Sequence, residues 1–78
     1  MMQRILSGRS DANIRFNDLR SLLRRLGFDE RIRGSHHMFT REDLDEILNL
    51  QPTGSEAKIY QVRQVRQFII KHGLEDVS

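Results

Sequence analysis

FDERIRGSHHMFT, residues 28–40, is the stretch that predicts the centre of the fold. In residues 28–33 apolar and charged side chains alternate loosely, and residues 36–40 include strand-forming types. Gly34 and Ser35 separate the two runs, and a two-residue break that begins with glycine is typical of a hairpin turn. The stretch therefore predicts two antiparallel strands joined by a tight turn.

A third strand is predicted over residues 46–50, which end at the Pro-containing turn of residues 51–54. A helix over residues 43–50 is the alternative, because the apolar residues there also have helical spacing. We favour the strand, because an antiparallel sheet needs a third member to be stable. The charged residues 41–43 then connect the second strand to the third.

Residues 17–26 are predicted to form an amphipathic helix. The apolar residues that recur there at helical spacing are Phe16, Leu19, Leu22, Leu23 and Leu26. Asn13 or Asn17 is the expected N-cap, and Gly27 suits the position that follows a helix. The opposite side carries three arginines, for which a solvated face is expected and a patch for phosphate or an acidic protein is the alternative. These are Arg20, Arg24 and Arg25.

A second helix is predicted over residues 59–72 and ends at Gly73. Its apolar arc consists of Val62, Val65, Phe68 and Ile69. Arg66 falls at the edge of that arc, so its guanidinium is expected to extend toward the sheet. The order helix, three strands, helix predicts an α+β fold, α-β-β-β-α, in which two helices cover one face of a three-stranded antiparallel sheet.

A chain of 78 residues has room for one domain. We expect an N-terminal leader over residues 1–13 with one helical turn, the domain over residues 14–74, and a tail over residues 75–78. The net charge of +2 is compatible with a polyanionic partner, and the absence of cysteine excludes disulfides and Cys-based zinc sites. No apolar run approaches the roughly 20 residues that span a bilayer. A cytoplasmic domain without a membrane partner is therefore expected.

The histidine pair His36-His37 opens the second predicted strand. Successive strand residues point to opposite faces, so one ring is expected to be accessible and the other partly buried. Because the turn can reset the alternation, the sequence leaves open which is which. An accessible imidazole, with an unperturbed pKa of about 6.5, can take a proton from an RNA 2′-OH. The alternative is that both histidines have no chemical role.

Two other uses of these histidines are disfavoured. Adjacent residues on opposite strand faces make a poor chelating pair, and His72 lies at a helix end, so no metal site is expected. A nucleophilic pair of Ser35 with a histidine lacks an obvious acid to orient it.

GSHHMF at residues 34–39, preceded by a helix that ends LGF at residues 26–28 and followed by a C-terminal helix, resembles the HicA family of toxins. The resemblance extends over residues 16–74. It implies a fold like the double-stranded RNA-binding domain, in agreement with the order read from periodicity. It also implies mRNA cleavage without metal or cofactor by a toxin of a type II toxin–antitoxin system, which a HicB-type antitoxin neutralises.

Carried onto this sequence, the resemblance makes Gly34 and Ser35 the turn and His36 the catalytic residue, with His37 as the alternative. The RNA is then expected to lie across the exposed sheet face, held by a set of polar and basic residues. These are Arg31, Arg33, Ser35, Lys58, Arg63 and Arg66. Two alternative functions remain: an RNA-binding module without catalysis, and a domain that binds only protein.

Overall fold

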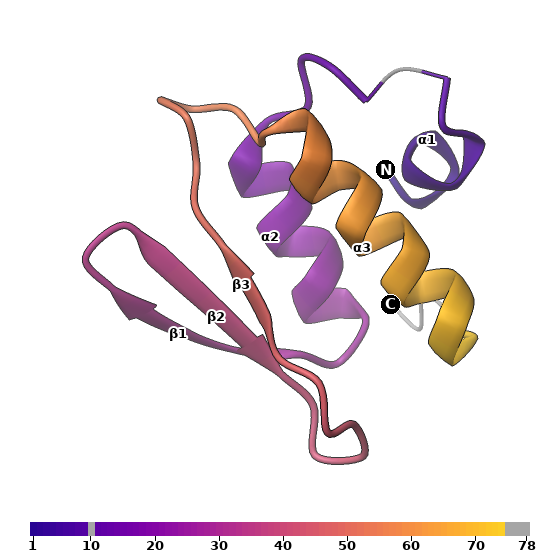
Figure 1. The fold of residues 1–78 in the computed structure, drawn as a ribbon, viewed down its shortest axis with the longest axis vertical. Coiled ribbons are helices and arrows are strands. Elements are labelled where there is room, and N and C mark those ends of the chain that lie inside the picture. Colours follow the sequence, from indigo (N-terminus) through magenta and orange to yellow (C-terminus); the bar gives the residue numbers. More distant parts are fainter. Residues whose placement is uncertain (10, 75–78) are drawn as a thin grey trace.

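The structure, a computed structural model, describes residues 1–9 and 11–74. Along the chain it has six elements: α1 (Met2–Ser7), α2 (Phe16–Arg25), β1 (Asp29–Arg33), β2 (His36–Thr40), β3 (Leu48–Leu50) and α3 (Ile59–His72). From α2 onward this is the predicted α-β-β-β-α order of an α+β fold (Figure 1). No helix in the described part of the chain is long and apolar enough to cross a membrane.

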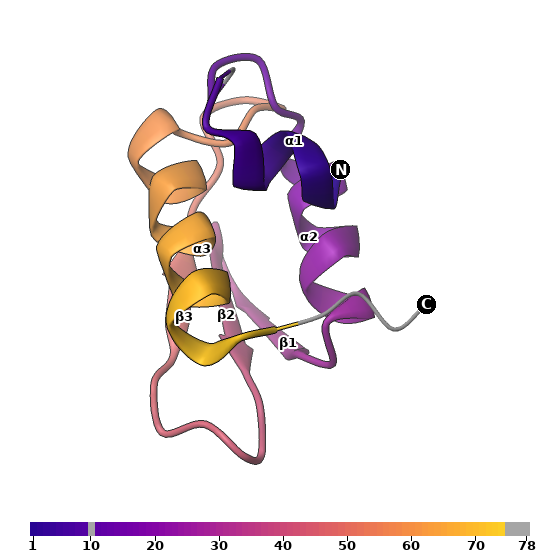
Figure 2. The same cartoon turned by 90° about the vertical axis from the view of Figure 1, so that its right-hand side faces the viewer.

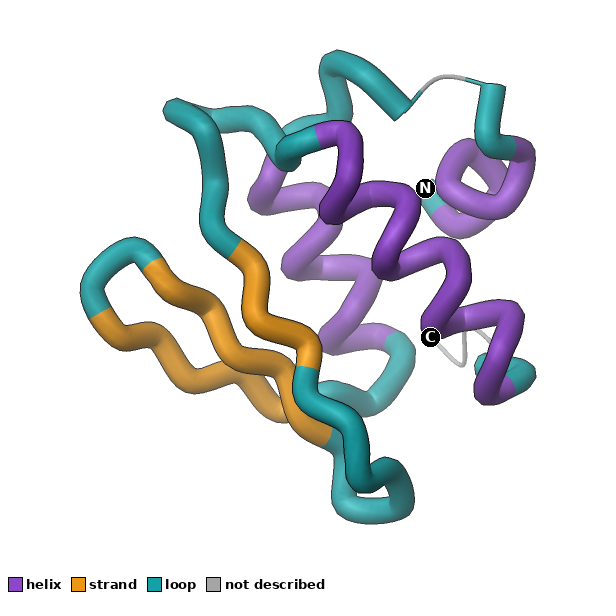
Figure 3. Tube along the Cα trace, in the orientation of Figure 1, coloured by secondary structure: helices purple, strands orange, loops and turns teal. Residues whose placement is uncertain are grey.

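The three strands form an antiparallel meander in the order β1-β2-β3 (Figure 3). The predicted hairpin is confirmed, since Arg33 pairs with His36 across the Gly34-Ser35 turn. Gly34 has a φ of +58°, a conformation that L residues with a side chain rarely adopt. The third strand is shorter than predicted, and the alternative helix over residues 43–50 is wrong.

α2 and α3 lie side by side on one face of the sheet and leave the other face bare (Figure 1). Alternation along each strand sends Phe39 of β2 and Leu48 and Leu50 of β3 toward the helices, where they are fully buried. The predicted apolar arcs of both helices meet them there. We call the side of the sheet that faces away from the helices the open face.

α2 begins one residue earlier than predicted, and neither predicted asparagine caps it. Its N-cap is Arg15, which makes no side-chain capping hydrogen bond. Instead, the Phe16 N–H donates to the Ser55 carbonyl of the loop before α3, at 2.9 Å. Backbone from a distant loop therefore satisfies one of the N–H groups of the first turn that have no partner within the helix.

The N-terminal residues are more ordered than the predicted leader. α1 packs against α3 on the side away from the sheet, as Figure 1 and Figure 2 show together. Its Ile5 has no exposed surface and belongs to the core. Arg4 ties α1 to the following loop through the carbonyls of Ala12 and Asn13, at 3.3 and 3.4 Å. The predicted tail, residues 75–78, lies outside the described residues.

Candidate functional site

The two histidines lie on opposite faces of β2, as the alternation predicted. His36 is exposed on the open face, and its Nδ1 lies 3.4 Å from Asn49 Oδ1 on β3. His37 faces the helices and is only 9% exposed. The structure therefore settles which ring is accessible, a question that the sequence left open.

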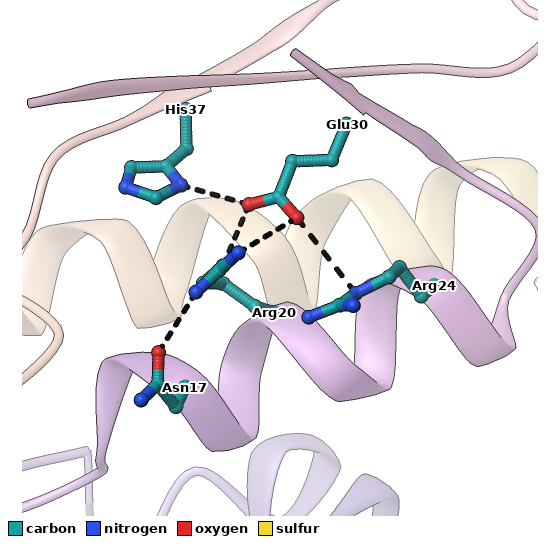
Figure 4. A network of polar contacts seen from close by, with 5 residues as sticks. All are labelled: Asn17, Arg20, Arg24, Glu30 and His37. Atoms are coloured by element: carbon teal, nitrogen blue, oxygen red, sulfur yellow. Dashed lines mark hydrogen bonds and ion pairs between the residues drawn. The ribbon is translucent and has the colours of Figure 1, made fainter. Parts of the chain in front are cut away.

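The ring of His37 is held from two sides beneath the sheet. Its Nδ1 lies 2.7 Å from Glu30 Oε2 on β1 (Figure 4). Its ring also packs edge-on with the ring of Phe16, at a centroid distance of 4.8 Å. Glu30 on β1 pairs with the buried Phe39 on β2, so its side chain also points toward the helices. His37 thus links the central strand to the carboxylate of its neighbour.

Glu30 joins the hairpin to α2. Its carboxylate accepts hydrogen bonds from Arg20 Nε at 2.6 Å and Nη2 at 3.1 Å, while Arg24 Nε lies 3.7 Å away (Figure 4). Asn17 Oδ1 accepts a further bond from Arg20, at 3.0 Å. The expected solvated face is therefore wrong for Arg20, because its partner is an inward-facing strand carboxylate. Glu30 was not among the predicted site residues, although an acid at a strand position that faces the core is itself a signal of a buried ion pair.

The open face gathers the exposed histidine and two of the predicted RNA contacts. Arg33 pairs with His36 across the hairpin, and Arg31 pairs with Met38 two residues along. Ser35 lies in the turn, where its hydroxyl accepts a hydrogen bond from Gln51 Nε2 at 2.9 Å. The alternation and register assign eight residues to this face: Asp29, Arg31, Arg33, His36, Met38, Thr40, Ile47 and Asn49.

The family model described as "HicA toxin of bacterial toxin-antitoxin" matches residues 16–74. The chain belongs to the HicA toxin family. No curated protein and no solved structure matched it in the corresponding comparisons. Membership in a toxin–antitoxin family implies an antitoxin as partner. The match covers the chain from the start of α2 to just beyond α3, so α1 lies outside the part that defines this protein as HicA.

Three of the predicted RNA contacts lie away from the open face of this HicA toxin. Arg66 donates to Asp11 Oδ1 at 2.8 Å and to the Ile5 carbonyl at 3.4 Å, and Arg63 lies 3.5 Å from the same aspartate. The expected extension of Arg66 toward the sheet is therefore wrong, because its partners belong to the N-terminal segment. Lys58 is the N-cap residue of α3, 5.8 Å from the ring of Tyr60.

Arg66 also stabilises the ionised form of Asp11, because its hydrogen bond holds the pKa of Asp11 below the ordinary value.

In the described residues of this HicA toxin, no three His, Cys, Asp or Glu side chains lie together in a way that would hold a metal ion.

Glu30 is the most deeply placed of the carboxylates with a shifted pKa. Burial alone would raise its pKa, but hydrogen bonds from Arg20 and His37 outweigh that effect and hold the pKa below the ordinary 4.5. A carboxyl whose pKa falls on folding stabilises the protein above its unfolded pKa. That stabilisation is lost as the pH falls through the lower, folded value.

Glu30→Gln in this HicA toxin is expected to lower the free energy of unfolding at pH 7 by about 1–3 kcal/mol, because two donors lose an ionised acceptor. The variant should also lose less stability than wild type between pH 5 and pH 3, as the titrating group is gone. Urea denaturation at several pH values measures both effects. The control is Glu56→Gln, at an exposed side chain without a hydrogen bond in the described residues. An equal pH dependence in wild type and Glu30→Gln would contradict the assignment.

Proposed function

We propose that this HicA toxin is an endoribonuclease that cleaves mRNA without a metal or cofactor and is neutralised by a HicB-type antitoxin. The observation that supports this most is the position of His36. Its ring is exposed on the open face, with Arg33 directly opposite on β1. Side chains in such a pair have Cβ atoms about 5 Å apart, close enough to act on one phosphodiester.

In the proposed reaction His36 acts as the base. A proton on Nδ1, directed at the Asn49 oxygen, leaves the Nε2 lone pair free toward solvent. Nε2 accepts the proton of a ribose 2′-OH, the 2′ oxygen attacks the adjacent phosphorus, and the bond from phosphorus to the 5′ oxygen breaks. Water supplies a proton to the departing 5′ oxygen. The products are a 2′,3′-cyclic phosphate and a 5′-hydroxyl end.

His36 is a better candidate than His37 for this step because of access. Nδ1 of His37 is bound to Glu30, and the ring is packed against Phe16 beneath the sheet. A phosphodiester on the open face would have the β2 backbone between itself and this ring. We therefore assign proton transfer to His36 and a structural role to His37.

The proposed RNA path begins on the open face. Arg31 and Arg33 supply positive charge there, and Ser35 contributes a hydroxyl at the hairpin end. The wider set predicted from the sequence adds Lys58, Arg63 and Arg66, all at or on α3. An RNA that also contacts these residues has to leave the sheet and pass around that helix. Contacts to the phosphates and to the shape of the RNA backbone would then contribute more to affinity than hydrogen bonds to the base edges.

The test is cleavage of a generic mRNA by the purified full chain in EDTA. We expect fragments with 2′,3′-cyclic phosphate ends, because the 2′ oxygen is the nucleophile. For binding, the log of the affinity should fall with the log of the salt concentration by about 0.7 per phosphate contact. A gel shift without cleavage would instead support the RNA-binding module, and the absence of both would support a domain that binds only protein.

A further inference from the structure

A hollow on the open face begins at Met38, two positions after His36 on β2, and the proposed reaction does not use it. Its volume is about 540 Å³, and its lining includes Asp29, Arg31, Met38, Thr40 and Ile47. All five residues belong to the open face: four come from β1 and β2, and Ile47 immediately precedes β3. The hollow is thus built by the sheet itself and does not depend on a loop alone.

The hairpin register fixes how these side chains are arranged. Arg31 pairs with Met38 and Asp29 pairs with Thr40, so each rung of the hollow has one residue from β1 and one from β2. Met38 follows His36 by two positions on the same face, a separation of about 7 Å along the strand. A nucleotide bound at His36 would therefore have its neighbour over the hollow.

We propose that this hollow binds the base of a nucleotide next to the scissile phosphate and selects guanine. The proposal rests on the ribonuclease function proposed above, because it needs RNA on the open face. It assigns to Asp29, Arg31, Met38 and Thr40 a role in sequence preference that is separate from the proton transfer at His36.

The apolar residues and Arg31 suit the flat ring of a base. Met38 offers a thioether, which makes favourable contacts with aromatic rings, and Ile47 is 59% exposed beside it. The guanidinium of Arg31 can stack on a base through its planar face. The described residues of the open face include no Phe, Tyr or Trp, so these groups supply the platform that such residues provide in other RNA-binding sheets.

The polar end of the hollow favours guanine over the other bases. Asp29 is exposed, and its carboxylate makes no side-chain hydrogen bond or ion pair with the described residues. A carboxylate offers two acceptor oxygens side by side, and guanine presents two adjacent donors, N1–H and the 2-amino group. Uracil, cytosine and adenine each present a single donor group on that edge, next to at least one acceptor. Inosine, which lacks the 2-amino group, keeps one donor of the two.

The experiment measures binding of the full chain to uncleavable 2′-O-methyl heptamers of uridine with one central guest nucleotide. By fluorescence anisotropy, wild type should bind the guanosine guest about tenfold more tightly than adenosine or uridine, with inosine in between. Asp29→Asn should reduce that ratio toward one, since an amide replaces one acceptor by a donor. Asp18→Asn, which removes the same charge from the exposed side of α2, should keep the ratio.

The outcomes separate this proposal from the function on which it rests. Equal binding of all four guests, or an unchanged guanosine preference in Asp29→Asn, overturns the base site even if mRNA is cleaved in EDTA. No binding of any heptamer together with no cleavage overturns the ribonuclease function, and the base site with it. A lost preference in Asp29→Asn with uridine binding unchanged supports the site, because misfolding would weaken binding to every guest.

Discussion

His36→Ala is expected to slow mRNA cleavage by about 10²–10⁴-fold, the usual contribution of a positioned acid–base group. The side chain is exposed on the open face and its only hydrogen bond in the described residues is to Asn49, so the fold should not depend on it. His36→Gln is the matched variant, because glutamine keeps a donor near Asn49 but cannot transfer a proton at neutral pH. Single-turnover cleavage rates, with circular dichroism to check folding, measure the effect.

His37→Gln separates the two histidines. The substitution removes the ring that packs against Phe16 and moves the donor that faces Glu30, so we expect a lower melting temperature. At a temperature where the variant is folded, its cleavage rate should stay within a few-fold of wild type. Two results would refute the assignment of proton transfer to His36. One is a His36→Ala variant that cleaves at the wild-type rate, and the other is a large loss of cleavage rate in folded His37→Gln but not in His36→Ala.

Periodicity predicted the helices and the hairpin well, because these elements depend on local patterns. The final helix has the predicted bounds, Ile59–His72, since its apolar arc is clear and Gly73 takes the left-handed conformation that ends it. β2 also has its predicted bounds, because a glycine turn precedes it. The third strand was less certain, because the spacing of its apolar residues fits both a strand and a helix. Only its pairing with β2 decides between the two.

The candidate site was predictable in part. The Gly-Ser-His segment was identified from the sequence, but its partners come from segments that only the fold brings together. Asn49 and Gln51 reach the segment from β3 and the residue after it, 13 and 16 positions later in the chain. Finding them required the strand register, which the sequence did not provide.

Charged residues show the same limit. Arg20 was expected in solvent, and only the packing of α2 on β1 reveals its bond to Glu30, ten positions away. Arg66 was expected to point to the sheet, because nothing indicated that the N-terminal segment would fold over α3 and present Asp11 to it. Helical periodicity gives the direction in which an arginine side chain leaves its helix, but it does not say which other segment of the chain lies in that direction.

The role of that N-terminal segment leads to the second large effect. Ile5→Ala is expected to lower the free energy of unfolding by about 2–5 kcal/mol, the usual cost of truncating a fully buried isoleucine. Small domains have only about 5–15 kcal/mol in total, so the variant should unfold at a clearly lower urea concentration than wild type. Urea denaturation measures the change, and the adjacent Leu6→Ala is the control, since Leu6 is 42% exposed on the same helix.

The comparison of these two variants tests whether α1 belongs to the folded domain even though it lies outside the HicA family match. α1 contacts α3 on the side opposite to the sheet, so Ile5→Ala should reduce stability without changing the cleavage rate of the folded fraction. Equal stability of Ile5→Ala and Leu6→Ala would show that α1 does not pack on the core in solution. A lower rate in folded Ile5→Ala would instead mean that α1 influences the open face through α3, contrary to the separation of stability and chemistry that the structure indicates.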